Sequence, residues 1–387
     1  MRSIWLDQGL MLLFAGSFMV FVNLHLAFII MPLYVLELGG GDWTAAWYNT
    51  LLAGAAVLFR FLFASWVDRY GRRLSLLVSG LALVTAPLFI LLAGSSTAYL
   101  LLVRLIQALG LALYPLAANT LIADLSPVAR RGTVLGLQRL IILTALITGP
   151  PVAVLIVEHY GFQTLFGLIS ILGLAGMVPL SAVREPVRAR VGTPAPHGFQ
   201  AALASRSLRL LIWATSACGL AYGVLLTFLP LYAVRVGIEN FGLYFTVFAF
   251  SGLVAGVVAG RLSDAFGRRK VLVPSLVLFG TGILCLGLPA PGTAMVVSAA
   301  VAGAGYSASL TLLVAWVVDA AGRKLRAASL GLFENGIDAG IMAGSFAFGS
   351  VVALLGFGFA FSTAGALLLV FAVLIATLDR GPRPQIR

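Results

Sequence analysis

Twelve long apolar runs restrict the fold of this chain more than any other feature of the sequence. A helix needs roughly 20 mostly apolar residues to cross the hydrocarbon core of a bilayer. The strands of a membrane β-barrel are about 10 residues long and alternate apolar with polar positions, whereas these runs are continuous. We therefore predict an all-α integral membrane protein with twelve transmembrane helices. The predicted spans are 10–36, 43–67, 74–93, 98–122, 133–157, 162–182, 209–233, 241–262, 271–289, 293–318, 327–354 and 357–378.

The composition excludes most classes of soluble protein. Hydrophobic residues make up 61% of the chain and charged residues 10%, whereas a soluble domain is roughly 45–50% apolar and about 25% charged. The two cysteines, Cys218 and Cys285, lie in apolar runs without metal-ligand spacing, so no metal site is expected. The sequence has no nucleotide-binding P-loop and no Ser-His-Asp or HExxH pattern. We therefore expect no cofactor, no catalytic residues and no enzymatic activity.

The distribution of basic residues predicts the orientation in the membrane. If the N-terminus lies in the cytoplasm and the spans alternate, 21 of the 25 basic residues fall on the cytoplasmic side. The external loops then hold a single base, Arg235, together with Glu37, Asp42, Glu158 and Glu239. This positive-inside pattern predicts a multi-pass protein of the cell membrane with both termini in the cytoplasm. The net charge of +12 thus reflects topology and anionic lipid, and no nucleic-acid partner is expected.

Polar segments recur in the same register in the two halves of the chain. MPLYVLELGG at 31–40 returns as LPLYAVRVGI at 229–238, and VDRYGRRLSLL from Val67 returns as SDAFGRRKVLV from Ser263. RGTVLGL from Arg131 returns as RAASLGL at an offset of 195. Internal repeats of this kind indicate two related structural units. We predict an N-terminal six-helix half at 1–182, a cytoplasmic loop at 183–208, a C-terminal six-helix half at 209–378 and a cytoplasmic tail at 379–387.

The repeated loops carry a motif with a known counterpart. Residues 64–76 read ASWVDRYGRRLSL and residues 260–272 read GRLSDAFGRRKVL. Both resemble the G-x-L-a-D-r-x-G-R-R-x-x-L motif of the major facilitator superfamily, and the second copy is nearly complete. The resemblance implies two bundles of six helices that rock about a site at the middle of the membrane. The gating residues that it implies are Asp68, Arg69, Gly71, Arg72, Arg73, Asp264, Gly267, Arg268 and Arg269.

The resemblance also implies neighbours for the two motif aspartates. In the family's fold, span 2 neighbours span 11 and span 8 neighbours span 5, so Asp68 and Asp264 lie near helix N-termini. An aspartate beside a helix N-terminus gains roughly 0.3–1 kcal/mol. Our hypothesis is that both aspartates latch the cytoplasmic side closed, while Gly71 and Gly267 permit the tight turns. The alternative is that these loops supply topology charges only.

Two further motifs bear on proton coupling and on the direction of transport. Arg104 and Gln107 in span 4 match R-x-x-Q-G-x-G, and the resemblance gives Arg104 a role in proton coupling. The alternative for Arg104 is a bond to backbone carbonyls of span 1. Gly136, Gly149 and Pro150 in span 5 match part of the G-x8-G-x3-G-P-x-x-G-G motif of proton-driven exporters, with three of its glycines replaced. The partial match favours export.

Five charged residues lie inside predicted spans: Arg60, Arg104, Arg139, Glu334 and Asp338. A charge near the bilayer centre costs at least about 2.5–3.5 kcal/mol, so each is a functional candidate by default. Glu334 and Asp338 are four residues apart and share one helix face. Two carboxylates this close in a low dielectric do not both ionise easily, so we predict that they serve proton coupling. The alternatives are static pairs with Arg60 or Arg139 and the binding of a cationic substrate.

Other polar residues on the spans complete the candidate set. His25 lies near the middle of span 1 and titrates near neutral pH, which suits proton coupling, and a packed histidine is an equal alternative. The resemblance places spans 1, 4, 7 and 10 around the central cavity. Tyrosines there are at least as often packing groups as ligands. The candidate substrate-binding residues are Asn23, Gln107, Tyr114, Asn119, Arg139, Tyr222 and Tyr306.

Together these features predict a secondary active transporter. The preferred function is a proton-coupled antiporter that exports a small apolar or amphipathic compound by alternating access. One alternative is a proton symporter that imports a small organic or zwitterionic metabolite, and a second is a membrane enzyme or receptor. The sequence disfavours the second, since it shows no catalytic pattern and no extramembrane domain. The expected partners are a small-molecule substrate, protons and membrane lipid, and the expected state is a monomer.

Overall fold

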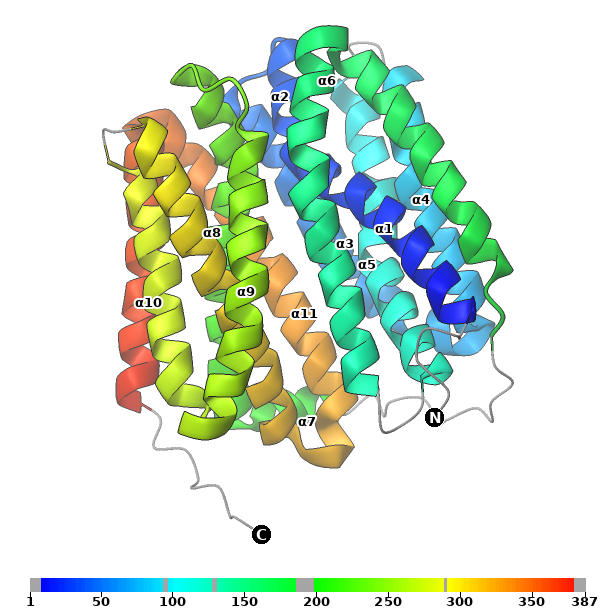
Figure 1. Cartoon of the computed structure of the whole chain (residues 1–387), viewed down its shortest axis with the longest axis vertical. Coiled ribbons are helices and arrows are strands. Elements are labelled where there is room, and N and C mark those ends of the chain that lie inside the picture. Colours follow the sequence, from blue (N-terminus) through cyan, green and yellow to red (C-terminus); the bar gives the residue numbers. More distant parts are fainter. Residues whose placement is uncertain (1–7, 93–96, 127–130, 186–197, 289–290, 379–387) are drawn as a thin grey trace.

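The computed structural model describes residues 8–92, 97–126, 131–185, 198–288 and 291–378. Helices joined by short turns make up these residues, and no strand occurs among them (Figure 1). The helices are α1 (Gln8–Ile29), α2 (Met31–Glu37), α3 (Asp42–Tyr70), α4 (Arg72–Leu92), α5 (Thr97–Leu125), α6 (Arg131–Ala182), α7 (Gly198–Ala204), α8 (Arg206–Arg235), α9 (Gly242–Phe266), α10 (Arg268–Leu286) and α11 (Pro291–Leu378).

Two of these elements contain apolar stretches that are too long to cross a membrane once. The stretch Val134–Ala182 in α6 has 49 residues and Ala328–Thr377 in α11 has 50, so each is about 75 Å long at about 1.5 Å per residue. Gly161 (φ 78°) interrupts the first and Gly356 (φ 83°) the second, in a conformation that glycine adopts most readily. The ten apolar stretches in the described residues therefore contain twelve crossings. This confirms the predicted all-α fold with twelve transmembrane helices.

Two predicted boundaries differ from the structure. The predicted first span, 10–36, is divided, because α1 ends at Ile29 and α2 begins at Met31 with Pro32 in its first turn. Proline has no backbone N–H and starts a helix more readily than it continues one. The predicted polar loop 183–208 contains α7, which packs on α11, and its Ala202 is fully buried.

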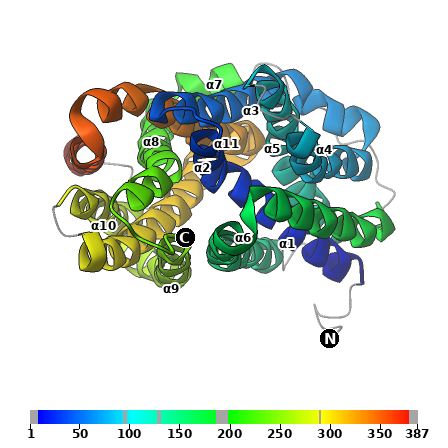
Figure 2. The same cartoon turned by 90° about the horizontal axis from the view of Figure 1, so that it is seen from above.

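The helices form two bundles. Helices α1–α6 pack on one another, as do α8–α11, and we call these sets the N-half and the C-half. Seen from above, the two sets lie side by side, with α2 and α3 near their junction (Figure 2). The halves meet where α3 contacts α11, where α6 contacts α9, and where α8 contacts α1, α2 and α3. A site built by both halves must lie among these helices.

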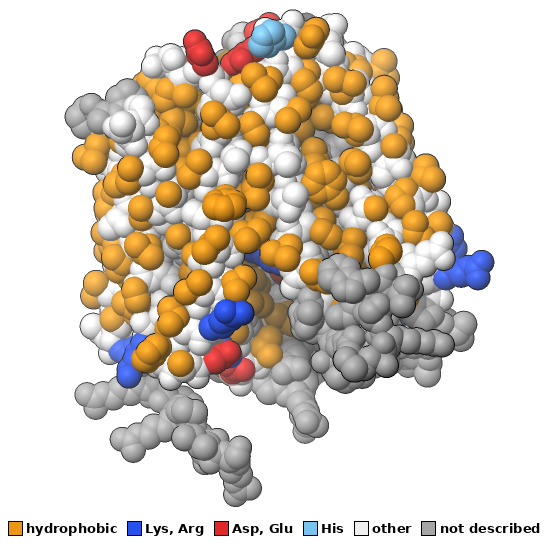
Figure 3. All heavy atoms as spheres, viewed as in Figure 1, with side chains coloured by type: hydrophobic (Ala, Val, Ile, Leu, Met, Phe, Trp, Pro, Cys, Tyr) orange, Lys and Arg blue, Asp and Glu red, His pale blue; other side chains and the backbone are white. Residues whose placement is uncertain are grey.

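The two ends of the molecule carry opposite charges. At one end, Gly71 (φ 95°) and Gly267 (φ 91°) form the tight turns α3–α4 and α9–α10, and two arginines follow each turn. The other end carries Glu37, Glu158 and Glu239, all exposed, and acidic side chains are visible there at the top of Figure 3. We call these the basic end and the acidic end.

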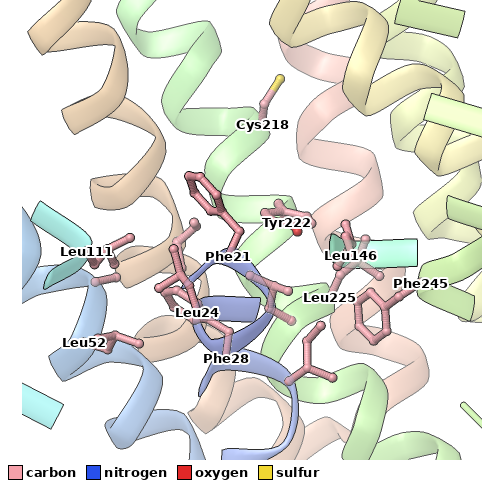
Figure 4. Packing of buried hydrophobic residues seen from close by; sticks show 14 of the residues in the cluster. Phe21, Leu24, Phe28, Leu52, Leu111, Leu146, Cys218, Tyr222, Leu225 and Phe245 are labelled. Atoms are coloured by element: carbon pink, nitrogen blue, oxygen red, sulfur yellow. The ribbon is translucent and has the colours of Figure 1, made fainter. Parts of the chain in front are cut away.

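The middle of the interface between the halves is apolar. Figure 4 shows Phe21, Leu24 and Phe28 of α1 between Leu52 of the N-half and Leu225 of the C-half. At most 7% of the surface of each of these residues is exposed. Lipid tails are as apolar as leucine, so such contacts gain from close van der Waals packing and not from removal of water. Polar groups within this interface are therefore the candidates for function.

Candidate functional site

An ion pair joins the two halves inside the membrane. Arg60 of α3 contacts Asp338 of α11, with 2.7 Å between Nη2 and Oδ2. Arg60 also donates to Asn335 Oδ1 at 2.8 Å and to the carbonyl of Ala112 at 3.4 Å. Each side chain of the pair is 10% exposed. Removal of one partner from a buried pair costs about 3–5 kcal/mol, because the other charge is left uncompensated. The charge of Asp338 is therefore coupled to the contact between α3 and α11.

Glu334 lies one turn from Asp338 and has a different environment. Glu334 and Arg139 of α6 are both exposed, although both lie within transmembrane helices. Neither makes a hydrogen bond or ion pair with any residue that the structure describes. Their charges nevertheless act on each other across the interface between the halves. Figure 3 shows an opening in the lower part of the visible face, with a basic side chain inside it.

Aromatic rings of the C-half line the same region. Tyr222 of α8 and Tyr306 of α11 stack with ring centroids 4.4 Å apart and 19° between the ring planes. Phe248 of α9 extends the stack, at 5.9 Å from Tyr222 and 5.6 Å from Tyr306. The charge of Arg139 acts on both tyrosines and that of Glu334 on Tyr306. Neither tyrosine hydroxyl bonds to a described residue. Tyr222 is buried, with 8% of its surface exposed, whereas Tyr306 is only partly buried.

Arg104 lies in a separate polar network, nearer the acidic end. It is fully buried and donates to Gln107 Oε1 and to Asn49 Oδ1, each at 2.8 Å. Asn49 donates in turn to the carbonyl of Phe28 in α1 and to Thr227 Oγ1 of the C-half. The bond to a span 1 carbonyl that the sequence offered as an alternative for Arg104 is therefore made by Asn49. The structure does not bring Arg104 into contact with the carboxylates of α11.

Three of the predicted substrate-binding residues are buried inside the N-half. Asn23 donates to the carbonyl of Ile169 at 3.0 Å, and the Tyr114 hydroxyl lies 3.0 Å from Ser17 Oγ. Asn23, Gln107 and Tyr114 are at most 2% exposed. Their polar groups are engaged by the protein in this conformation.

The remaining two polar candidates differ in exposure. Asn119 of α5 is exposed. His25 of α1 is partly buried, with its ring centroid 6.5 Å from that of Phe21. The Nδ1 atom of His25 is buried and has no hydrogen-bond partner among the described residues.

Polar contacts hold the halves together at the acidic end. Arg235 Nη2 lies 2.6 Å from Asp42 Oδ2, and the Arg235 guanidinium lies 5.0 Å from the centre of the Phe357 ring. Thr246 of α9 donates to the carbonyl of Ile147 in α6 at 2.7 Å. Among the described residues, the hydrogen bonds and ion pairs between the halves begin at the acidic end, and the last of them toward the basic end is the ion pair between α3 and α11. In the part of the chain that the structure describes, the contacts between the halves therefore lie toward the acidic end, and Figure 3 shows an opening toward the basic end.

The first motif loop at the basic end is held within the N-half. Glu185 accepts hydrogen bonds from the backbone N–H groups of Arg72 and Arg73 at 3.0 and 3.1 Å, which caps the first turn of α4. The Arg72 side chain also pairs with Asp124 of α5 at 2.9 Å. Two motif side chains lie outside the described part of the structure, those of Asp68 and Arg69.

The second motif loop is held within the C-half. Arg268 pairs with Asp264 at 3.0 Å and with Asp319 at 3.2 Å, and Arg269 donates to the carbonyl of Ala376. The Asp264 side chain is 71% exposed. The structure thus places Asp264 beside an arginine of its own half, and the hypothesised latch to span 5 is not closed in this conformation.

The predicted span 5 motif packs closely at one end only. A Cβ on Gly149 would lie 3.6 Å from Val22 of α1, and a Cβ on Gly242 of α9 would lie 2.6 Å from the carbonyl carbon of Pro150. A Cβ on Gly136 would meet nothing within 4 Å. The glycine and proline near the acidic end therefore allow α6 to approach α1 and α9.

Sequence reasoning missed four residues that organise these contacts. Asn49 and Asn335 bind the buried arginines, and a single neutral amide in an apolar span gives no distinctive signal. Asp124 and Asp319 pair with Arg72 and Arg268. These two aspartates are 195 positions apart, which equals one of the offsets between the repeats. Their equivalent positions in the two halves could therefore have identified both as partners of the motif arginines.

Comparisons with known proteins agree with this architecture. "Multi-drug resistance efflux pump PmrA" of Streptococcus pneumoniae is 27% identical over 282 residues, or 70% of each chain. "Multidrug resistance protein MdtG" of Proteus mirabilis is 28% identical over 287 residues, also 70% of each chain. The nucleoside transporter NupG superposes with a TM-score of 0.81 at 14% identity, over 96% of this chain and 100% of that one. The xylose transporter XylE from E. coli, in a partially occluded inward-open conformation, gives 0.73 at 16% identity, over 98% and 100%.

The family assignment follows from the length of the match. The family model described as Major Facilitator Superfamily matches residues 13–241 and 236–387, which together cover nearly the whole chain. The twelve crossings and the two bundles agree with the solved structures that share this fold. The resemblance inferred from the two repeated loops is therefore confirmed, and the chain belongs to the Major Facilitator Superfamily.

Proposed function

We propose that the chain is a proton-driven antiporter that exports a small apolar or amphipathic compound across the cell membrane by alternating access. The basic end faces the cytoplasm, according to the positive-inside pattern. The names of the two relatives, an efflux pump and a multidrug resistance protein, support export. The observation that carries the proposal is the ion pair between Arg60 and Asp338 across the two halves, with Glu334 one turn away.

A proton on Asp338 changes the contact between the halves. In this conformation the carboxylate lies 2.7 Å from Arg60. Protonation removes the negative charge and leaves Arg60 with the neutral acceptor Asn335 and a backbone carbonyl. Complete loss of one partner of a buried pair costs about 3–5 kcal/mol, and this is the upper limit for the free energy by which protonation of Asp338 weakens the contact between the halves. Because a ligand shifts an equilibrium by its differential affinity for the two states, the proton can drive exchange between the two states of the transporter.

The opposite state opens the acidic end and closes the basic end. The contacts of Arg235 with Asp42 then break. Asp264, which is 71% exposed here, approaches the start of α6, where the helix dipole stabilises a carboxylate by roughly 0.3–1 kcal/mol. Asp68 approaches the helix that begins near Ala328 in the same way. The two motif aspartates therefore close the cytoplasmic side in the outward-open state.

Respiring everted membrane vesicles test this proposal, because their cytoplasmic face is outside and their lumen is acidic. We expect the protein to move Hoechst 33342 or ethidium into the lumen, and nigericin to stop this by collapsing the pH gradient. Asp338→Asn should abolish accumulation against a gradient and retain exchange down a gradient. Glu158→Gln is the matched control, because it removes an exposed acid that takes part in no ion pair of a described residue. Normal accumulation by Asp338→Asn would contradict the proposal.

The direction of movement separates export from the symport alternative. Protons leave the acidic lumen in this assay, and an antiporter therefore moves its substrate inward. A symporter moves proton and substrate together, so it would empty preloaded vesicles. Proton-driven loss of dye from the lumen would replace the antiport proposal with symport.

A further inference from the structure

A pocket lies between the two halves at the acidic end. Its volume is about 320 Å³, and small-molecule sites have volumes of roughly 300–1,000 Å³. Residues of α2 and α6 in the N-half form one wall. The end of α8 and the segment between α8 and α9 in the C-half form the other. Neither residue of the ion pair between Arg60 and Asp338 lines this pocket, so the proposed proton coupling does not account for it.

The walls of this pocket are apolar and carry acidic groups. Leu33 of α2, Phe162 of α6 and Phe241 of the segment between α8 and α9 are among the apolar side chains that line it. Three carboxylates line it as well, those of Glu37, Glu158 and Glu239. Ligand sites are typically apolar, with a few polar or charged groups that fix the orientation of the ligand. This lining therefore fits a ligand with an apolar body and a positive charge.

No basic group that the structure describes balances the three carboxylates. All three are exposed, and none makes a hydrogen bond or ion pair with a described residue. The neighbouring bases in the sequence are engaged elsewhere, because Arg235 pairs with Asp42 and His159 Nδ1 lies 2.9 Å from the carbonyl oxygen of Leu155. Among the described residues, no group of three acids, histidines or cysteines could hold a metal ion. The negative charge is thus spread over the pocket, which suits an organic cation better than a metal ion.

The pocket exists because the halves are in contact at this end. Asn240 Nδ2 donates to the carbonyl of Pro151 in α6 at 3.5 Å, and α2 contacts α8. Gly242 packs so closely on Pro151 that an added Cβ would overlap its backbone. Opening of the acidic end moves α2 and α6 away from α8 and α9, and this separates the two walls. A ligand in the pocket therefore contacts both halves only while the acidic end is closed.

We propose that this pocket binds a small organic cation with an apolar body from the external side and thereby holds the acidic end closed. The cationic group lies between Glu37 and Glu239, which belong to opposite halves, and the apolar body contacts Phe162 and Phe241. A ligand that binds one conformation in preference to another shifts the equilibrium toward it, and the shift grows with the ratio of ligand concentration to Kd. The inference goes beyond the proposed function, because this cation regulates the cycle and is not the transported compound.

Four probes test binding to purified protein in phosphatidylcholine nanodiscs. Phenylbutyltrimethylammonium has the charge and the apolar body, phenylbutanol has the body alone, phenylbutyrate has the opposite charge, and tetramethylammonium has the charge alone. Isothermal titration calorimetry should show the first probe binding about tenfold or more tightly than each of the others, or at least about 1.4 kcal/mol. Empty nanodiscs of the same lipid correct for partitioning of the probes into the bilayer.

Variants of one glutamate from each half identify the site. Glu37→Gln and Glu239→Gln should each weaken binding of phenylbutyltrimethylammonium about two- to fivefold, the range for exposed ion pairs, and the double variant should weaken it about tenfold. Binding of phenylbutanol should not change. Glu37→Asp and Glu239→Asp are the matched controls, because they keep the charge and should keep most of the affinity. Thermal unfolding of each variant verifies that it is folded.

Transport into everted vesicles tests the effect on the cycle. The acidic end faces the lumen there, and the permanent charge of phenylbutyltrimethylammonium slows its passage through lipid. The probe should lower the initial rate of Hoechst 33342 uptake when it is loaded into the lumen, and have little effect when it is added outside. A higher concentration of Hoechst 33342 outside should not relieve the inhibition, since that compound enters from the basic end. The double variant of Glu37 and Glu239 should be insensitive to the probe.

Three results overturn the inference. They are equal affinities for phenylbutyltrimethylammonium and phenylbutanol, wild-type affinity in the double variant, and inhibition that outside Hoechst 33342 relieves, since the probe then occupies the transport site. Failure of the proposed function is distinguishable from each of them. Proton-driven uptake of Hoechst 33342 without selective binding of the cation would refute this inference alone. Selective binding that depends on Glu37 and Glu239, without proton-driven transport, would refute the proposed function alone.

Discussion

The contact between Arg235 and Asp42 should control how often the acidic end opens. Asp42 is the first residue of α3 and Arg235 the last of α8, so the pair connects the N-half with the C-half. The distance from Nη2 to Oδ2 is 2.6 Å, and the side chains are 57% exposed for Arg235 and 10% for Asp42. Loss of the pair should favour the state in which the acidic end is open.

The size of the effect follows from the exposure of each partner. Exposed ion pairs are worth about 0.2–1 kcal/mol, because solvent screens them. We assign about 1 kcal/mol to Asp42→Asn, since Arg235 is then left in contact with water. Arg235→Gln should cost about 1–2 kcal/mol more, because Asp42 loses this contact while its other oxygen is already buried without a partner. The open population should therefore rise about fivefold in Asp42→Asn and about 30-fold or more in Arg235→Gln.

Distances between spin labels across the acidic end measure this population. Tyr160→Cys in the N-half and Leu288→Cys in the C-half give label sites that are 72% and 56% exposed. The native cysteines are removed as Cys218→Ala and Cys285→Ala. The long-distance fraction in double electron–electron resonance should increase in the order wild type, Asp42→Asn, Arg235→Gln. High salt should reduce the difference, because it screens the pair.

The control for this experiment is Glu158→Gln. Glu158 is also an exposed acid at the acidic end, and no ion pair of a described residue involves it. An equal shift in Glu158→Gln would show that overall charge controls the opening. An unchanged distribution in Arg235→Gln would refute the reasoning directly.

Substitutions at three further contacts extend these tests. Arg60→Met should lower the free energy of unfolding by about 3–5 kcal/mol, because Asp338 is left buried and unpaired. The double variant Arg60→Met with Asp338→Leu should recover most of this stability, and denaturant titrations measure both changes. Proton coupling should remain lost in the double variant. Gly242→Ala should disturb the closed acidic end, since its Cβ would lie 2.4 Å from a backbone atom of α6. Spin-label distances check this, and Gly136→Ala, with nothing within 4 Å of its Cβ, should leave them unchanged. Glu185→Gln keeps a hydrogen-bond acceptor but removes the charge at two N–H groups of α4, and should lower the melting temperature by an amount corresponding to about 0.3–1 kcal/mol.

The fold was accessible from the sequence because a membrane imposes a simple length rule. Continuous apolar runs of about 20 residues can form little else than spanning helices. The breaks at Gly161 and Gly356 fall at boundaries between predicted spans. What the sequence did not contain was the rotation of each helix about its own axis. When every face is apolar, periodicity does not identify the face that is turned to the interface between the halves.

The candidate site shows the consequence of this missing rotation. Asn23, Gln107 and Tyr114 are polar residues on predicted cavity helices, yet each is at most 2% exposed. Glu334 and Asp338 share a helix face, as their spacing predicts, but one turn separates an exposed carboxylate from a paired one. The partners that decide these environments come from other helices, and a sequence pattern along one helix cannot reveal them.

The two ion pairs between the halves differ in a way that suits different tasks. Arg235 is the one base that the sequence places outside, and it lies in the last turn of α8, while Asp42 lies in the first turn of α3. Each charge is therefore stabilised by the dipole of its own helix. When this pair separates, Arg235 remains in contact with water and the first turn of α3 still supports the charge of Asp42, which suits a gate that opens in every cycle. Arg60 and Asp338 have no helix terminus beside them and are 10% exposed each. In the proposed function, a proton on Asp338 neutralises the carboxylate and allows this inner pair to separate, whereas the outer pair separates without one.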